Sequence, residues 1–166
     1  LRVHAEAFQP AQLLGTVLES ASHAAERQGI HVHFEDLWPP EQSVTGDPQL
    51  LEQVVNNLIA NAVKFSSAGA TVGVRLLPAQ DGWRVEVQDH GVGIAAADLP
   101  KLFQRFVRGS NAKAAHTQGA GLGLFVSKAI VEGHGGQIYL TSREGEGTTV
   151  WFDLPRRTSE PRFVGF

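Results

Sequence analysis

The sequence predicts a single α/β domain, an α+β two-layer sandwich in which helices cover one face of a mixed, largely antiparallel sheet. The chain has 166 residues, of which 42% are hydrophobic, and a chain of this size can bury one core without disulfide bonds. Segments with helical spacing of apolar residues are interspersed with segments that alternate as strands do. Because the two kinds of segment lack regular βαβ alternation, a layer of helices on a largely antiparallel sheet is the expected arrangement.

The first half of the chain contains two predicted helices with a strand between them. Apolar residues recur at helical spacing over residues 10–28, and the glycine that follows ends the helix. The sequence IHVHFED then alternates as a strand. Asp47 is a good N-cap and Pro48 suits the first helical position, so we expect a second helix from there to about Phe65.

The second half is expected to contain two hairpins, a short helix and a third long helix. Residues 71–77 and 83–88 flank the turn residues Gln80, Asp81 and Gly82, which is typical of a hairpin. The later elements expected are a short helix over about 98–106, a mobile loop over 109–121, a helix over about 122–132, and strands over 137–141 and 148–154.

The composition limits the classes of function. The chain carries 14 basic and 17 acidic residues, and a net charge of −3 argues against a general nucleic-acid binder. Without cysteine there is no thiolate metal ligand or cysteine nucleophile. The chain also lacks methionine, so we expect it to be a piece of a longer protein. Residues 1–155 are expected to form the domain, and the basic, proline-containing residues 156–166 to form a disordered tail.

Two asparagines and a lysine are aligned on the second predicted helix. At about 100° per residue, Asn57, Asn61 and Lys64 fall within about 60° of one another, at the border of the apolar stripe. A solvated helix face would explain them. However, asparagine is a poor helix former, carboxamide oxygens can bind Mg²⁺, and a lysine can bind a terminal phosphate.

A second candidate site follows the predicted strand WRVEVQ. The sequence GVGIAA fits a dinucleotide-binding glycine pattern, but the acidic residue expected about 20 positions later and the surrounding βαβ unit are missing. The alternative is that Asp89 accepts a hydrogen bond from an exocyclic amine such as that of adenine. A simple Asp-x-Gly turn also explains this segment.

A third candidate is the glycine-rich segment 119–124, which enters the third long helix. Free N–H groups at a helix N-terminus can bind phosphates, although the segment is equally consistent with a plain loop. The chain contains no Gly-Lys-Ser/Thr motif, which excludes a Walker-type NTPase, and no V-A-I-K or H-R-D motif of eukaryotic protein kinases. The seven histidines do not show the spacing of a zinc site.

Taken together and in order, these motifs resemble the ATP-binding catalytic domain of bacterial two-component sensor histidine kinases, within the GHKL ATPase superfamily. NNLIANAVKFS resembles the N box, DHGVGI the first glycine box, LFQRFVRG the F box and QGAGLGLFVSKAIVEGHGG the second glycine box. GEGTTVWFDLP resembles the strand that closes such domains. The resemblance covers about residues 6–155 and implies a Bergerat fold, with three main helices on one face of the sheet and a flexible ATP lid over about 108–118.

The resemblance implies roles for residues of the N box and the first glycine box. Asn61 would be the principal Mg²⁺ ligand, supported by Asn57, and Lys64 would contact phosphate oxygens. Asp89 would bind the adenine amino group, with Thr148 beside it. The remaining residues implied around the nucleoside are Phe65, Gly91, Gly93 and Ile94.

The resemblance also assigns residues to the phosphates. Either Arg105 or Arg108 would neutralise the γ-phosphate, and with Asn61 and Lys64 they form the predicted catalytic set. The phosphate-wrapping residues implied for the lid and the following helix are Gly119, Gly121, Leu122, Gly123 and Leu124. The implied cofactors are ATP and Mg²⁺.

The implied function is transfer of the ATP γ-phosphate to a histidine on a separate dimerisation and phosphotransfer domain of the same parent kinase, which would in turn signal to a response regulator. This fragment is expected to be monomeric and cytoplasmic, within a homodimeric parent that is either free or membrane-anchored. Two alternatives stay open: a nucleotide-sensing module without transfer, and an anti-sigma-type serine kinase. In the latter group an acid stands one turn before the Mg²⁺ asparagine, where this chain has Asn57.

Overall fold

The computed structural model describes residues 1–104 and 123–158. In chain order the elements are β1 (Glu6–Phe8), α1 (Pro10–Glu26), β2 (His31–Asp36), β3 (Val44–Gly46), α2 (Pro48–Phe65), β4 (Thr71–Ala79), β5 (Gly82–Asp89), the 3-10 turn η1 (Leu99–Lys101), α4 (Gly123–Gly133), β6 (Gln137–Arg143) and β7 (Gly147–Pro155).

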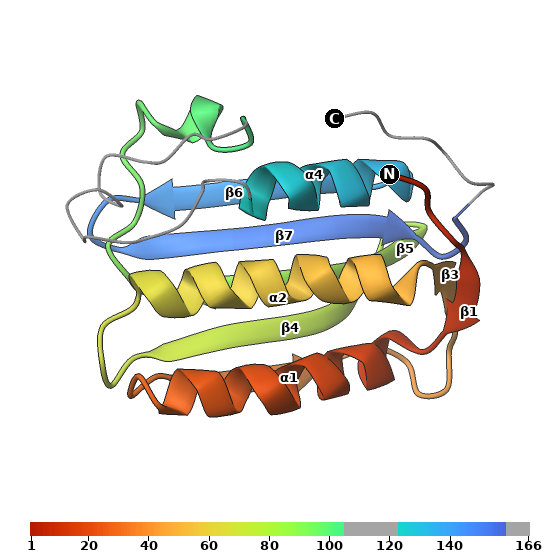
Figure 1. The fold of residues 1–166 in the computed structure, drawn as a ribbon, viewed down its shortest axis with the longest axis horizontal. Helices are drawn as coiled ribbons and strands as arrows, with labels where there is room; N and C mark the ends of the chain where they lie inside the picture. The colour runs from red at the N-terminus through yellow and green to blue at the C-terminus, as the bar shows by residue number, and fades with distance from the viewer. Residues whose placement is uncertain (105–122, 159–166) are drawn as a thin grey trace.

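The main sheet is five-stranded, with strand order β2-β4-β5-β7-β6. β2 pairs with β4 in parallel, and the other neighbours are antiparallel. Helices α1, α2 and α4 lie side by side on one face of this sheet (Figure 1). The predicted fold class, a mixed and largely antiparallel sheet with three main helices on one face, is therefore confirmed.

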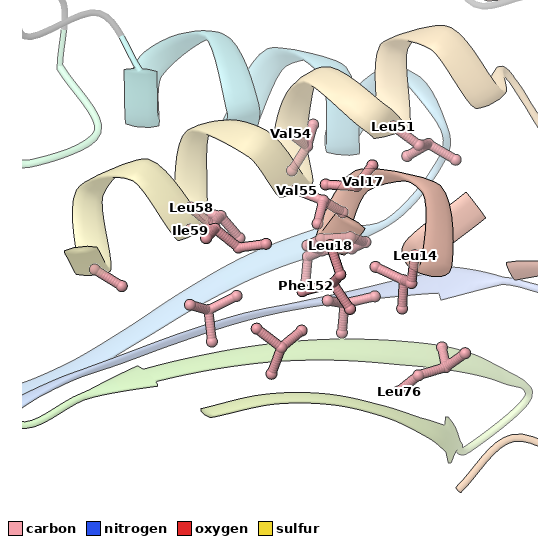
Figure 2. Packing of buried hydrophobic residues seen from close by; sticks show 14 of the residues in the cluster. Leu14, Val17, Leu18, Leu51, Val54, Val55, Leu58, Ile59, Leu76 and Phe152 are labelled. Carbon is pink, nitrogen blue, oxygen red and sulfur yellow. The ribbon is translucent and has the colours of Figure 1, made fainter. Parts of the chain in front are cut away.

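The core lies between the helices and the sheet (Figure 2). Packing against this core explains why α2 is helical although it contains Asn57 and Asn61, because apolar residues at helical spacing give the helix one buried side. Leu14 of α1, Val54 of α2 and Phe152 of β7 are all completely buried. The buried residues of α2 are Leu51, Val54, Val55, Leu58, Ile59, Ala62 and Val63.

The predicted start of α2 is confirmed. The Asp47 side chain accepts a hydrogen bond from Leu50 N–H at 3.2 Å, and Pro48 occupies the first turn, where its missing N–H costs nothing. This cap fixes where the helix begins, and so fixes which residues reach the opposite end of α2.

Three features add to the predictions or differ from them in detail. β1 and β3 form a small antiparallel sheet of three residues each, too short to show a sequence period. The short helix expected over about residues 98–106 is present in its described part as the 3-10 helix η1, and Leu102 and Gln104 donate to carbonyls three residues earlier, as in 3-10 turns.

The third difference concerns the end of the domain. The domain boundary predicted at residue 155 falls short, because Thr45 N–H donates to Arg156 O and Thr158 N–H donates to Thr45 O. These bonds continue the edge of the small sheet, so residues 156–158 belong to the domain and not to a disordered tail. Residues 159–166 lie outside the described residues.

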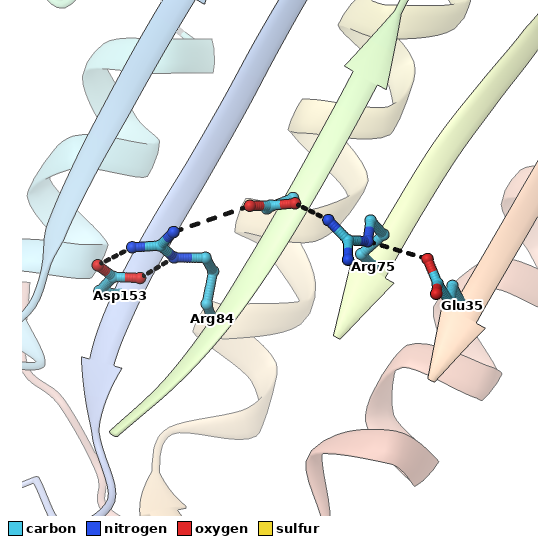
Figure 3. Close-up of polar contacts among 5 residues, drawn as sticks. Glu35, Arg75, Arg84 and Asp153 are labelled. Atoms are coloured by element: carbon cyan, nitrogen blue, oxygen red, sulfur yellow. Dashed lines mark hydrogen bonds and ion pairs between the residues drawn. The ribbon is translucent and has the colours of Figure 1, made fainter. Parts of the chain in front are cut away.

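The face of the sheet opposite the helices carries a ladder of charges across four strands (Figure 3). Arg84 lies between Asp153 and Glu86, and Arg75 lies between Glu86 and Glu35. The strand register places Arg75 opposite both Glu35 and Glu86, and Arg84 opposite Asp153, at N–O distances of 2.6 to 3.0 Å. Arg84 and Glu86 are two residues apart on β5, at 3.8 Å. Since the pairs are partly exposed, each is expected to contribute only about 0.2–1 kcal/mol to stability.

Candidate functional site

Those predicted site residues that the structure describes gather at one end of the sandwich. α2 ends there at Phe65, β5 ends at Asp89, α4 begins at Gly123, and β7 enters at Gly147 (Figure 1, left). Motifs that are far apart in the sequence therefore meet, because the end of α2, the end of β5, the start of α4 and the start of β7 lie at the same edge of the fold.

Asn57 and Asn61 lie next to the beginning of α4. Both asparagine side chains are half-buried on α2. A Cβ placed on Gly123 would lie 3.7 Å from Asn61 Nδ2 and 4.0 Å from Asn57 Cγ, so α4 begins directly against the two carboxamides. The alignment predicted from helical spacing thus leads to a shared position beside a helix N-terminus.

Lys64 and Phe65 close the C-terminal end of α2. Lys64 Nζ lies 5.9 Å from the centre of the Phe65 ring, within the range of a cation–π interaction, and both residues are half-buried. The carbonyl of Phe65 accepts a hydrogen bond from Val92 N–H at 3.4 Å. The segment that follows β5 is therefore attached to the end of α2.

Asp89 is a nearly buried carboxylate, with 7% of its surface exposed. Burial raises the pKa of Asp89, while N–H groups of Gly91 and Thr148 donate to the carboxylate and oppose that shift. The bond from Gly91 N–H to Asp89 Oδ1 measures 2.9 Å. Asp89 also lies opposite Thr148 in the register of β5 and β7. An ionised carboxylate can only accept hydrogen bonds, so this position suits a ligand with a donor group.

The first glycine box is held by close backbone contacts. A Cβ on Gly91 would lie 2.1 Å from the Phe65 carbonyl oxygen. Gly93 has φ of 68°, and a Cβ there would lie 2.0 Å from the Arg143 carbonyl oxygen. The packing of this segment against α2 and β6 therefore requires both glycines. This reason is separate from the space for the base that the resemblance implies.

Ser142 was not predicted as a site residue. Its hydroxyl accepts a hydrogen bond from Ile94 N–H at 2.8 Å, donates to Gly147 O at 2.8 Å, and lies 2.8 Å from Thr148 Oγ1. Strand alternation places Ser142 on the same face as Ile138 and Leu140, toward the helices. That alternation was a signal in the sequence, but only the register of β6 against β7 shows that Thr148 is its neighbour.

The remaining predicted residues are placed as follows. Leu124 is half-buried on α4 and packs against the core. Arg105, Arg108, Gly119, Gly121 and Leu122 lie outside the described residues, as does the expected lid over 108–118.

The described residues suit a magnesium ion that is bound partly by the substrate. Among them, no group of three His, Cys, Asp or Glu side chains could hold a metal ion. The carboxamides of Asn57 and Asn61 offer neutral oxygen ligands, and Mg²⁺ is commonly bound by one or two protein oxygens together with substrate phosphates and water. The two asparagines therefore fit an ion that arrives with a phosphate ligand.

Comparison with known proteins identifies the class. Residues 46–158 match the family described as histidine kinase-, DNA gyrase B- and HSP90-like ATPases. The match covers more than half of the chain, so the chain belongs to this family and is a nucleotide-binding domain. The resemblance inferred from the sequence motifs is confirmed.

Individual relatives narrow the comparison to sensor kinases. The chain is 34% identical to the sensor protein GacS of Pseudomonas syringae pv. syringae over 143 residues, covering 84% of this chain and 15% of that protein. It is 45% identical to the drug sensory protein A of Synechocystis sp. over 131 residues, 72% of this chain and 20% of that protein. The sensor histidine kinase WalK of Bacillus subtilis is 36% identical over 133 residues, covering 78% of this chain and 22% of that protein. The chain thus spans about a fifth of these relatives or less.

Solved structures agree with the sequence comparison. Full-length ShkA in complex with AMPPNP superimposes with a TM-score of 0.82 at 27% identity, covering 96% of this chain and 33% of that one. The mycobacterial sensor histidine kinase MprB gives a TM-score of 0.79 at 27% identity, covering 93% of this chain and 100% of that one.

In the part of the chain that the structure describes, no helix combines the length and apolar character needed to cross a membrane.

Proposed function

We propose that this chain binds Mg²⁺-ATP and transfers the γ-phosphate to a histidine on a separate dimerisation and phosphotransfer domain of its parent protein. The observation that carries this proposal is the position of Gly123 against the side chains of Asn57 and Asn61. It brings a helix N-terminus, which favours phosphate groups, next to two carboxamide side chains, a type of group whose oxygen suits a phosphate-bound ion.

The proposed site separates base recognition from phosphate chemistry. Asp89, nearly buried at the end of β5, would accept a hydrogen bond from the adenine amino group. Asn57 and Asn61 would hold the ion, whose charge would offset that of the phosphates. Lys64, beside Phe65, would donate to phosphate oxygens. Positioning and charge compensation of this kind are the main contribution of a protein to phosphoryl transfer.

The acceptor histidine is proposed to lie outside this chain. His134, the buried histidine of the described core, is 1% exposed and both of its ring nitrogens are engaged, so it cannot accept a phosphate without unfolding its surroundings. The relatives are several times longer than this chain, which supports a partner domain within the parent protein. A response regulator would then receive the phosphate, and the parent is proposed to be a homodimer.

The test is a transfer assay with γ-labelled ATP, Mg²⁺, this chain and the histidine-containing domain of the parent protein. We expect acid-labile phosphohistidine on that domain and little label on this chain alone. The variant Asn61→Ala should reduce transfer by at least about 100-fold, because removal of a charge-stabilising group of this kind typically costs that much.

Asn56→Ala is the matched control, since Asn56 is the exposed neighbour of Asn57 on the same helix. It should transfer at the wild-type rate. Acid-stable label on serine would instead favour the serine-kinase alternative. Nucleotide binding without any transfer would favour the nucleotide-sensing alternative.

A further inference from the structure

A row of hydrogen-bonding side chains crosses the sheet at the proposed adenine site. Asp89 of β5 lies opposite Thr148 of β7, and Thr148 lies opposite Ser142 of β6. Thr148 Oγ1 and Ser142 Oγ are 2.8 Å apart. Thr148 N–H also donates to the Asp89 carboxylate, so the three residues form one connected row.

The bonding capacity of Ser142 determines where the protons lie. A carbonyl oxygen can only accept, so the contact between Ser142 Oγ and Gly147 O, at 2.8 Å, uses the single proton of the serine hydroxyl. Ser142 Oγ also accepts from Ile94 N–H at 2.8 Å. It can then interact favourably with Thr148 only by accepting the threonine proton, which completes one donated and two accepted bonds.

In this arrangement the Thr148 hydroxyl can act toward a ligand only as a hydrogen-bond acceptor. Its hydroxyl proton is directed toward Ser142, and the neighbouring Asp89 carboxylate has no proton when ionised. The row therefore presents hydrogen-bond acceptors at its ligand-facing end. A purine with an amino group at that edge satisfies them, whereas a purine with a carbonyl oxygen there places acceptor against acceptor, and an unmatched polar contact of this kind is costly.

We propose that Ser142 is a positioning residue for nucleotide specificity: it orients the Thr148 hydroxyl and holds the Ile94 backbone, so that the site selects adenine over guanine nucleotides. The inference rests on the proposed function, because it assumes that a nucleotide base lies at Asp89. It assigns the discrimination to a residue that touches the base only through its neighbours.

The test compares binding of Mg²⁺-ATP and Mg²⁺-GTP by calorimetry. Ser142→Ala should weaken ATP binding about tenfold, the cost of misdirecting about one hydrogen bond, and leave GTP binding unchanged or tighter. The ratio of the two affinities should therefore fall. Ser142→Thr keeps the hydroxyl and should restore the ratio. Thr141→Ala is the control, because Thr141 is the exposed neighbour on the other face of the same strand.

A double-mutant cycle tests the connection to Thr148. Thr148→Val should reduce ATP binding to a similar extent, and the double variant should lose little more than either single one. If Ser142→Ala does not fold, as judged by its circular dichroism, Ser142→Cys keeps the side-chain volume and replaces it in both measurements. Equal loss of ATP and GTP affinity, or additive effects in the cycle, would overturn the inference. Wild-type protein that binds neither nucleotide would instead refute the proposed function.

Discussion

The Asp89 carboxylate is nearly buried, with 7% of the residue's surface exposed, and its hydrogen bonds do not fully offset the cost of burying its charge. The pKa of Asp89 is raised by burial despite two donated N–H bonds. Between its unfolded and folded pKa values the folded protein therefore binds more protons than the unfolded chain. The contribution of this group to stability is greatest at acid pH and is lost as the pH rises through the folded pKa.

This conflict predicts opposite effects of Asp89→Asn on binding and on stability. ATP affinity should fall by about 10- to 100-fold, since a hydrogen bond to a charged group contributes about 1.5–3 kcal/mol. The melting temperature of the nucleotide-free protein should rise at pH 7 and change less at a more acid pH, where the folded protein holds the proton of the Asp89 carboxyl more readily than the unfolded chain does. Calorimetric titration and thermal melts at both pH values measure the two effects.

Asp81→Asn provides the control, because Asp81 is exposed in the turn between β4 and β5, at the other end of the sheet. It should alter neither quantity. Unchanged ATP affinity in Asp89→Asn would contradict the adenine-binding role of this carboxylate.

At the scale of elements, the first glycine box is fixed between the end of α2 and the end of β6. Val92 makes two backbone bonds here: its N–H donates to Phe65 O, and its carbonyl accepts from Gly145 N–H at 2.7 Å. The segment is therefore built into the edge of the fold rather than left as a free loop. Its geometry depends on how closely the backbones of these elements can approach.

Gly91→Ala should disturb this junction. The new methyl group would lie 2.1 Å from the Phe65 carbonyl oxygen, so either the segment or the end of α2 must move. Overpacking of this kind destabilises by about 1–3 kcal/mol, and we expect weaker ATP binding as well. Urea unfolding and nucleotide titration measure both consequences.

Gly73→Ala is the matched control for this substitution. Gly73 lies in β4, and a Cβ there would meet nothing within 4 Å. The alanine should fold and bind ATP as the wild type does. A Gly91→Ala protein equal to Gly73→Ala in both measurements would show that the close approach is not required.

At the scale of the whole molecule, a buried histidine joins segments that are distant in the sequence. His134 Nε2 accepts from Asp47 N–H at 2.9 Å, and Nδ1–H donates to Ile130 O at 2.7 Å, which requires the neutral ring. Asp47 also accepts from His4 N–H at 2.9 Å. The end of α4, the start of α2 and the N-terminal segment are thus connected through His134 and Asp47.

This connection predicts loss of stability in mild acid. Burial lowers the pKa of His134, and the nearby Asp47 carboxylate, which acts in the opposite direction, does not cancel that effect. The unfolded chain therefore binds a proton that the folded protein excludes. Stability should be complete above the unfolded pKa of about 6.5 and decrease as the pH falls below it. Urea unfolding between pH 5 and 8 measures this dependence.

His134→Gln should flatten the pH dependence and destabilise the protein at pH 8 by about 1–3 kcal/mol, because one carboxamide cannot replace both contacts of the ring, with Asp47 N–H and with Ile130 O. His31→Gln is the control, since His31 is exposed on β2. It should retain the wild-type profile. A wild-type profile in His134→Gln would assign the acid sensitivity to another group.

The fold followed from the sequence where local patterns are strong. The bounds of α1 and α2 and the hairpin of β4 and β5 agree with the predictions to within about two residues, because period and capping are local properties. The small sheet of β1 and β3 and the bonds that join residues 156–158 to it were not predicted, since short strands are recognisable only by their partners. The roles of individual site residues stay predictions.

The sequence by itself determined the family, the order of the motifs and the chemistry available in them: carboxamides, a lysine, a carboxylate and glycines at characteristic spacings. Only the tertiary structure decided which of these groups meet. Helix packing places Gly123 beside Asn61, and Gly91 lies close to the Phe65 carbonyl. Strand register aligns the row from Asp89 to Ser142. These are set by burial of the shared core, a non-local property that no window of sequence contains.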